Sequence, residues 1–247
     1  MKSLPKGFRG AAIAAGLKSS GALDLTIIEN TGPRFDAAAV YTSNKVVAAP
    51  VIWSREVTKG KLVRAAVLNS GGANACTGPQ GFADTHHTAE KVADLLGISS
   101  GEVVVCSTGL IGELLPMPKI FSGLESIATV LKSDSLDDVS RAIMTTDSVP
   151  KVATVSISGV EFVGIAKGAG MLAPALATML SVVLTDAVLP QNAQEIFSRV
   201  ADRTYNRIDS DGCTSTNDTV LLMGSGASTV LISDVDFESA LMEICGS

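Results

Sequence analysis

Hydrophobic positions along the chain fall into short runs rich in Val, Ile and Leu, which are typical of buried β-strands. Such runs occupy residues 24–30, 65–70, 102–108, 179–187 and 218–224. Residues 152–166 alternate in a way that predicts a β-hairpin, with its turn at Ser158–Gly159. The chain is therefore expected to be rich in strands.

Two segments instead show the spacing of an amphipathic helix. The first covers residues 84–96 and is followed by Gly97, a residue that often ends helices. The second covers roughly residues 191–205, with Pro190 near its start. Because strands outnumber helices and no regular β-α-β rhythm appears, the pattern predicts an α/β layered sandwich with mixed sheets rather than a doubly wound parallel sheet.

The composition supports a globular domain with a small-molecule partner. Hydrophobic residues make up 46% of the 247 residues and charged residues 18%, which is sufficient for a packed core. Aromatic residues make up only 4%, so Val, Leu, Ile and Ala must fill most of that core. The net charge of −6 gives no overall basic footprint for nucleic acid or an anionic membrane.

The cysteine and histidine positions predict neither disulfides nor a metal site. The four cysteines are scattered without zinc-ligand spacing, and the two histidines are adjacent. Unpaired cysteines suit a reducing cytoplasm. The apolar stretch near the N-terminus ends at Lys18, and the longest apolar run, residues 171–184, is too short to cross a bilayer. We therefore expect a soluble, cytoplasmic protein.

Three glycine-rich turns follow predicted strands, at residues 69–78, 107–112 and 167–170. None has the spacing of a phosphate-binding or dinucleotide-binding loop. Each is most simply interpreted as a tight turn. The alternative is that glycine lets these backbones approach a ligand closely.

One hydroxyl, that of Thr178, lies where a loop meets a predicted buried strand, in KGAGMLAPALATML. The simplest interpretation is a core Thr whose hydroxyl bonds a nearby carbonyl. The alternative is chemical: a loop with Gly168, Gly170 and Pro174 can strain the peptide bond between Ala177 and Thr178. The hydroxyl would attack that carbonyl carbon, and water would then release the ester. Thr178 would become a new N-terminus, with a hydroxyl nucleophile and an amine base on one residue. Such an amine has a pKa of about 7.7–8.0 before burial lowers it, which is close to the working pH.

Several stretches together resemble the ornithine acetyltransferase family, also called glutamate N-acetyltransferase, of arginine biosynthesis. They are KGAGMLAPALATML, GFRGAAIAAGLKSSGALDLTII, NSGGANACTG, VCSTGLIGELLPMPK, AIMTTDSVPK and DGCTSTNDTVLLMGSGAS, in the expected order. The resemblance runs from about residue 7 to the C-terminus. It implies a fold of the N-terminal-nucleophile type, like that of ornithine acetyltransferase and DmpA.

The resemblance also implies a division of the chain by self-cleavage between Ala177 and Thr178. Residues 1–177 would form an α chain, and residues 178–247 would form the start of a β chain. Both would belong to one interleaved catalytic domain, assembled as two α and two β chains. Family members are longer, so we expect this β chain to be short relative to theirs.

By the same resemblance, Thr178 takes the acetyl group from N-acetylornithine and passes it to glutamate, which predicts ping-pong kinetics. Some members also use acetyl-CoA as donor. No metal or bound cofactor is implied. Thr108 and Gly109 would stabilise the oxyanion, through a hydroxyl and a backbone N–H.

Substrate binding is implied for Thr178 itself, for Thr145 or Thr146, and for Lys167, whose charge suits the α-carboxylate of both substrates. Alternatives remain an N-terminal-nucleophile amidase or aminopeptidase, with water as acceptor, and a ligand-binding remnant without turnover.

Other polar residues allow weaker interpretations. Asn217 and Asp218 are interpreted as part of a polar network near the site, together with the upstream residues Arg207, Asp209 and Asp211. Cys106 is interpreted as a small buried hydrophobe rather than a nucleophile.

Overall fold

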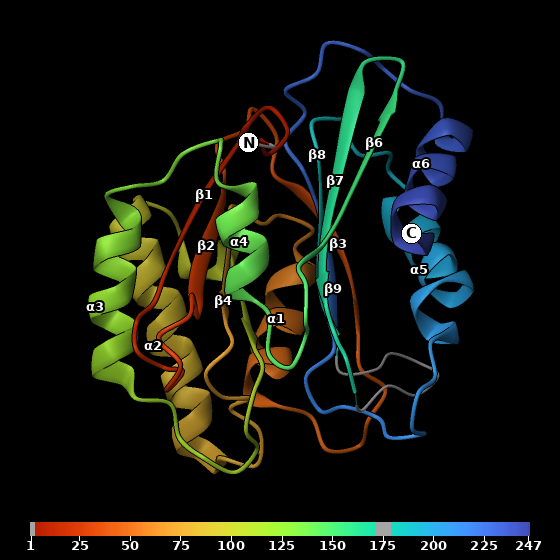
Figure 1. Ribbon diagram of the computed structural model, residues 1–247. Coiled ribbons are helices and arrows are strands. Elements are labelled where there is room, and N and C mark those ends of the chain that lie inside the picture. The colour runs from red at the N-terminus through yellow and green to blue at the C-terminus, as the bar shows by residue number, and fades with distance from the viewer. Residues whose placement is uncertain (1–2, 171–178) are drawn as a thin grey trace.

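The chain forms two mixed β-sheets that pack face to face, with helices on both outer sides (Figure 1). The computed structural model describes residues 3–170 and 179–247. The predicted α/β sandwich with mixed sheets is therefore confirmed.

The first sheet, sheet A, has the strand order β1-β2-β4-β5. Its strands are β1 (Phe8–Ile13), β2 (Leu25–Asn30), β4 (Ala65–Asn69) and β5 (Val103–Ser107). β1, β2 and β4 pair antiparallel, whereas β4 and β5 pair parallel. The carboxyl ends of β4 and β5 therefore meet at the same edge of the sheet.

The second sheet, sheet B, has the strand order β3-β9-β8-β7-β6. Its strands are β3 (Asp36–Tyr41), β9 (Thr219–Gly224), β8 (Leu180–Thr185), β7 (Val160–Lys167) and β6 (Lys151–Ile157). β8 and β9 are parallel, and the other neighbours are antiparallel. The last residue of β7, Lys167, consequently pairs with the first residue of β8, Leu180.

Six α-helices in the described residues surround these sheets. They are α1 (Ala49–Lys59), α2 (Gly78–Leu96), α3 (Met117–Ala128), α4 (Leu136–Ala142), α5 (Ala193–Arg203) and α6 (Asp234–Gly246). Short 3₁₀ turns occupy Ser100–Glu102 and Tyr205–Arg207. Helices α2 and α3 cover the outer face of sheet A, and α5 and α6 cover that of sheet B (Figure 1). α1 packs against the edge strands β5 and β3, and α4 against β1 and β2.

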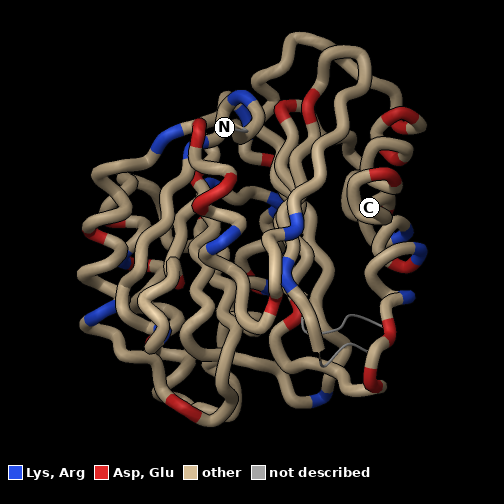
Figure 2. The backbone as a smooth tube through the Cα atoms, in the orientation of Figure 1, with Lys and Arg blue, Asp and Glu red and all other residues tan. Residues whose placement is uncertain are grey.

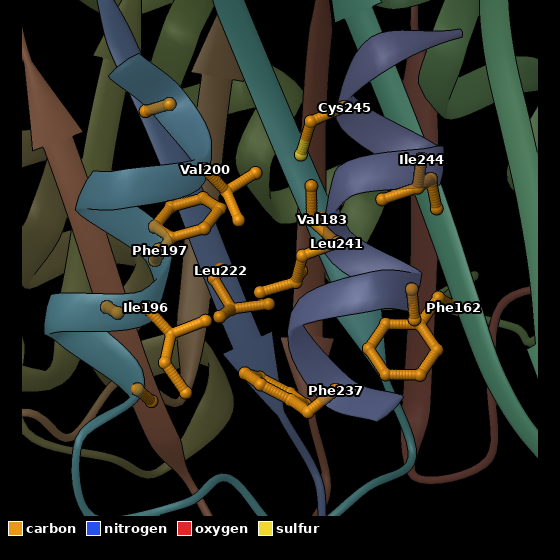
Figure 3. Close-up of a cluster of buried hydrophobic side chains, with 14 of the residues drawn as sticks. Phe162, Val183, Ile196, Phe197, Val200, Leu222, Phe237, Leu241, Ile244 and Cys245 are labelled. Atoms are coloured by element: carbon orange, nitrogen blue, oxygen red, sulfur yellow. The ribbon is translucent and has the colours of Figure 1, made fainter. Parts of the chain in front are cut away.

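Buried aliphatic side chains fill the space between the sheets. Leu68 and Val104 of sheet A share one cluster with Val182 and Leu221 of sheet B. A second cluster joins sheet B to α5 and α6, and it contains most of the buried aromatic residues (Figure 3). Burial at this scale stabilises each sheet from both faces, at about 1.5–3 kcal/mol per fully buried large apolar side chain.

Most predicted elements are confirmed. All five predicted strand runs contain a strand, and the hairpin turns at Ser158 and Gly159 with φ of 54° and 84°. Positive φ at both positions is the conformation that the right-handed twist of a two-residue hairpin requires. The helix expected over 84–96 begins earlier, at Gly78, and ends before Gly97 at φ 66°. Strands outnumber α-helices, as expected.

Lys and Arg positions are interspersed with Asp and Glu positions along the backbone trace of Figure 2. Among the described residues, no helix combines the length and apolar character needed to cross a membrane.

Candidate active site

Five strand ends converge at one edge of the two-sheet sandwich. Sheet A contributes the carboxyl ends of β4 and β5, and sheet B contributes the carboxyl end of β7 and the amino ends of β8 and β9. Hydrogen bonds from Asn217 to the turns that follow β4 and β5 bring the two groups together. Of the site residues that the sequence predicts, Thr108, Gly109, Thr145, Thr146 and Lys167 belong to the described part of the chain, and Thr108 and Lys167 meet at this edge.

The turns after β4 and β5 contact each other backbone to backbone. Thr108 N–H donates to the Asn69 carbonyl at 3.0 Å, and Gly72 forms a β-bridge with Thr108. Gly109 has a φ of 133°, and a Cβ placed there would lie 2.8 Å from the Gly72 nitrogen. Only glycine fits this contact, because no real Cβ tolerates backbone atoms so close. These turns are therefore tight turns in close mutual contact.

Lys167 reaches from sheet B to the predicted oxyanion residue Thr108. Its Nζ donates a hydrogen bond to Thr108 Oγ1 at 2.9 Å, and both residues are buried. An ammonium has no acceptor, so the hydroxyl accepts and still has its own proton to donate. A hydroxyl polarised by a cation is a stronger donor. The contact thus suits Thr108 for stabilising negative charge.

Lys167 is itself in an unusual electrostatic environment. Burial lowers the pKa of its ammonium from 10.5 to about 8, against the opposing attraction of Asp147 and Asp218. At neutral pH the group is therefore mainly protonated but titrates close to the working range. Attraction to these two carboxylates reduces the cost of removing the charge from water.

Asp147 fixes the turn that carries the predicted substrate residues Thr145 and Thr146. Its Oδ1 accepts from Gly168 N–H at 2.8 Å and from Lys151 Nζ at 2.5 Å, and its Oδ2 accepts from Thr145 N–H at 3.2 Å. Burial would raise the pKa of this carboxyl, but these donors outweigh burial, so the pKa is lowered. Asp147 thus connects the Thr145–Thr146 turn to the end of β7.

The predictions made from sequence did not include Asp147. Two features of the motif TTDSVPK could have indicated it. An Asp two residues after Thr145 can accept from that backbone N–H, and Lys151 follows it by four residues.

Asp218 lies immediately before β9 and is fully buried. Its Oδ1 accepts from Met179 N–H at 2.9 Å. Burial raises the pKa of this carboxyl from 3.8 to about 6, while the Met179 N–H and Lys167 act in the opposite direction. Met179 is the residue that follows Thr178 in the chain. The predicted nucleophile Thr178 and the predicted cleavage partner Ala177 lie outside the described residues.

The predicted polar network near the site is present in part. Asn217 and Asp218 both contact the turns and strand ends at this edge. By contrast, Asp209 Oδ1 accepts from Gly212 N–H within an exposed turn, and Arg207 is exposed. That part of the sequence is mainly a local surface turn.

Cys106 is buried in the core between the sheets, and burial raises the pKa of its thiol to about 12. Such a thiol is not a nucleophile at neutral pH, which confirms its interpretation as a small buried hydrophobe. Within residues 3–170 and 179–247, no group of three or more His, Cys, Asp or Glu side chains could hold a metal ion.

Comparison with known proteins decides the family. A sequence profile described as the ArgJ family matches residues 9–247. The chain belongs to the ArgJ family. It is 56% identical over 241 residues to the arginine biosynthesis bifunctional protein ArgJ of Streptomyces coelicolor, covering 97% of this chain and 63% of that protein. It is 51% identical to the ArgJ protein of Thermobifida fusca, covering 98% and 63%. The chain thus spans about 63% of the length of these relatives.

Solved structures agree with this assignment. Ornithine acetyltransferase from Mycobacterium tuberculosis, complexed with ornithine, matches with a TM-score of 0.64 and 49% identity, covering 69% of this chain and 92% of that one. ArgJ from Bacillus halodurans matches with a TM-score of 0.63 and 36% identity, covering 70% and 93%. An aminopeptidase from Ochrobactrum anthropi, described as a variant of the Ntn hydrolase fold, matches with a TM-score of 0.53 at 12% identity, covering 99% and 86%. The predicted N-terminal-nucleophile fold type is confirmed by these likenesses.

Proposed function

We propose that this ArgJ-family chain transfers the acetyl group of N-acetylornithine to glutamate, through an acetyl ester on Thr178. The relatives are named as arginine biosynthesis proteins, and one matching structure is an ornithine acetyltransferase that holds ornithine. The observation that carries the proposal is the contact of Lys167 Nζ with Thr108 Oγ1 at the edge where β8 begins. The contact joins Thr108 to Lys167, whose backbone pairs with Leu180 at the start of β8, the strand that follows Thr178 in the chain.

Self-cleavage between Ala177 and Thr178 is the first step of the proposal. Its support is a contrast of lengths. Nearly all of this chain, 98%, matches only 62% of the full-length M. tuberculosis relative. In contrast, a match to 69% of this chain already covers 92% of the solved M. tuberculosis chain. The solved chain is thus much shorter than the full relative, as expected for a protein that is divided in two.

After cleavage, the amine of Thr178 takes the proton of its own hydroxyl, and the oxygen attacks the acetyl carbonyl carbon. The tetrahedral oxyanion accepts hydrogen bonds from the Thr108 hydroxyl and the Gly109 N–H. Collapse expels ornithine, whose amine takes the proton from the Thr178 ammonium. Glutamate then attacks the acetyl ester by the same steps in reverse, which frees the hydroxyl of Thr178.

The amino-acid part of both substrates would bind beside the same residues. Each substrate has an α-carboxylate, and we assign it to the buried charge of Lys167 and to the turn with Thr145 and Thr146. Asp147 holds that turn against Gly168, so its position relative to Lys167 is fixed before substrate binds. A preset site of this kind avoids an ordering cost on binding.

Several further features belong to the same proposal. Acetyl-CoA as a second acetyl donor for glutamate is part of the proposal. We propose no metal and no bound cofactor, an assembly of two α and two β chains, and a cytoplasmic location. Each can be tested on purified protein or by fractionation.

The proposal is tested by a denaturing gel with N-terminal sequencing, followed by acetyl-transfer assays. We expect a fragment that begins TMLSVV, and we expect Thr178→Ala to remain uncut because it lacks the attacking hydroxyl. Acetylornithine should lose its acetyl group only when glutamate is present to accept it in steady state. Deacetylation that is indifferent to glutamate would indicate an amidase instead. Scission of Thr178→Ala at the same bond would show that another protease makes the cut.

A further inference from the structure

Asn217 connects the two sheets at the candidate site. It lies two residues before β9 of sheet B and is 5% exposed. Its side-chain nitrogen donates to the Ala73 carbonyl at 2.6 Å and to the Ser107 carbonyl at 2.9 Å. Ala73 belongs to the turn after β4, and Ser107 ends β5 of sheet A. One amide thus uses both of its hydrogens on two separate loops of the opposite sheet.

The orientation of that amide is also fixed. Its Oδ1 accepts from the Thr216 hydroxyl at 2.5 Å, and the Asn217 backbone N–H donates to Ser215 Oγ at 3.1 Å. Because the Ala73 and Ser107 carbonyls can only accept, the amide nitrogen must face them, which leaves the oxygen to accept from Thr216. A side chain held in this way is preset rather than selected from several rotamers.

Backbone hydrogen bonds join the two turns to each other: Thr108 N–H donates to the Asn69 carbonyl at 3.0 Å, and Ala73 N–H donates to the Leu110 carbonyl at 2.8 Å. The close contact between Gly72 and Gly109 lies within this pair of turns, and it does not fix the position of the pair relative to sheet B. The amide of Asn217 bonds both turns, on either side of this contact. Its removal would leave two buried carbonyl groups without these donors, and the joined turns would be free to shift relative to sheet B.

We propose that Asn217 is a positioning residue that sets the oxyanion turn, Thr108–Gly109, at its working distance from the start of β8. This inference rests on the proposed function for its catalytic meaning, but its structural part stands alone. β8 and β9 are paired directly, so a bond from the start of β9 to Ser107 also fixes Ser107 relative to β8. Asp218, the next residue, bonds Met179 N–H at the start of β8. The side chains of Asn217 and Asp218 thus fix the turns of sheet A relative to the start of β8 in sheet B.

The chain contains a matched control at the other end of β9. Asn30, at the end of β2, is likewise buried, and its side chain also bonds from sheet A to sheet B. Its side-chain nitrogen donates to the carbonyl of Gly224, the last residue of β9, at 3.1 Å. Loss of either Asn should weaken the packing of the sheets, whereas only Asn217 contacts the candidate site.

The test compares Asn217→Asp with Asn30→Asp. At neutral pH each variant has the shape of the native side chain but lacks the donors. Asn217→Ser serves if Asn217→Asp does not fold. Amide hydrogen exchange is measured over residues 70–75 and 107–112. We expect faster exchange in both turns for either Asn217 variant and native rates there for Asn30→Asp.

The same variants are assayed for the rate of acetyl-enzyme formation from N-acetylornithine. We expect a fall of roughly 100-fold for Asn217→Asp at an unchanged KM, because a small misplacement of a catalytic group is costly. For Asn30→Asp we expect the native rate per folded molecule. Native exchange in both turns of the Asn217 variants would overturn the inference, as would a native rate. Faster exchange in the Asn217 variants, combined with a native chain that transfers no acetyl group, would support the positioning role and refute the proposed function.

Discussion

The two sheets contribute different kinds of group to the candidate site. Sheet A contributes a neutral hydroxyl and backbone turns whose shape depends on Gly72 and Gly109. Sheet B contributes buried charges, chiefly Lys167 and Asp218. The geometry of the sheet A half therefore depends on close steric packing, and the properties of the sheet B half depend on buried charge. Changes in side-chain size should disrupt the first, and changes in pH should alter the second.

This division suits the proposed reaction. Oxyanion donors should keep one protonation state and one position throughout the reaction, which backbone N–H and hydroxyl groups do. Groups that bind substrate carboxylates must carry charge, and burial then brings their pKa values toward neutrality. The contact between Lys167 and Thr108 is where the two halves meet.

The largest effect is expected for Gly109→Ala. The new Cβ would lie 2.8 Å from the Gly72 nitrogen at a φ of 133°, so the turn must move. We expect loss of the Gly109 N–H donor and a fall in kcat of at least about 10²–10³-fold. The assay is the rate of acetyl-enzyme formation. Gly97→Ala is the control, because Gly97 also has positive φ but no atom within 4 Å of its Cβ position. Equal losses in the two variants would contradict a role for close packing.

The next largest effect is expected for Thr108→Val, which keeps the shape but removes the hydroxyl. We expect kcat to fall about 10²–10³-fold, corresponding to about 2.7–4 kcal/mol. Thr108→Ser retains the hydroxyl and should keep most of the activity. Steady-state kinetics of both variants test this. A native kcat in Thr108→Val would remove Thr108 from the oxyanion role.

A moderate effect is expected for Asp147→Asn, which weakens the bonds to Gly168 N–H and Thr145 N–H. Because that turn carries the predicted substrate residues, KM should rise more than kcat falls. The free energy of unfolding should decrease by about 1–3 kcal/mol. Asp137→Asn is the control, because Asp137 pairs with Arg141 at the same i,i+4 spacing but is exposed. We expect about 0–1 kcal/mol there. Similar unfolding midpoints for the two variants would contradict the assignment.

The smallest and most gradual effect is the pH dependence of stability contributed by Asp218. Its pKa is raised from 3.8 to about 6, so between these values the folded state binds the proton more tightly. This contribution is full below pH 3.8 and is lost as the pH rises through 6. Lys167 has the opposite behaviour. Its pKa is lowered from 10.5 to about 8, so stability should increase as the pH rises from 8 toward 10.5.

Urea unfolding of the native chain and of Asp218→Asn across pH 4 to 7 measures the first contribution. The native chain should lose stability relative to the variant as the pH rises through 6. A constant difference across that range would show that Asp218 is not perturbed in the folded state.

The sequence predicted the central strands better than the rest of the fold. β8 and β9 contain β-branched or long aliphatic residues at most positions, so their pattern was clear. β1 (FRGAAI) and β3 (DAAAVY) were missed because Ala and Gly have little strand preference. These two strands form only because a neighbouring strand pairs with them, β2 for β1 and β9 for β3. Pairing of that kind cannot be read from local pattern.

For the candidate site, the resemblance to a family supplied residue identities, and the structure supplied their contacts. Thr108 and Lys167 are 59 positions apart, so no motif could show that one donates to the other. Asn217 is separated from Ser107 by 110 positions and from Ala73 by 144. Such contacts arise from the packing of the two sheets. The sequence predicted the sandwich fold class but not which residues of the two sheets meet.

Mass spectrometry of the denatured chain after exposure to N-acetylornithine tests the central claim most directly. The account predicts two fragments, residues 1–177 and a second that begins at Thr178. The second should gain the mass of one acetyl group and lose it when glutamate is added. An unbroken chain that nevertheless transfers acetyl groups, or an acetyl group on any residue other than Thr178, would contradict the account.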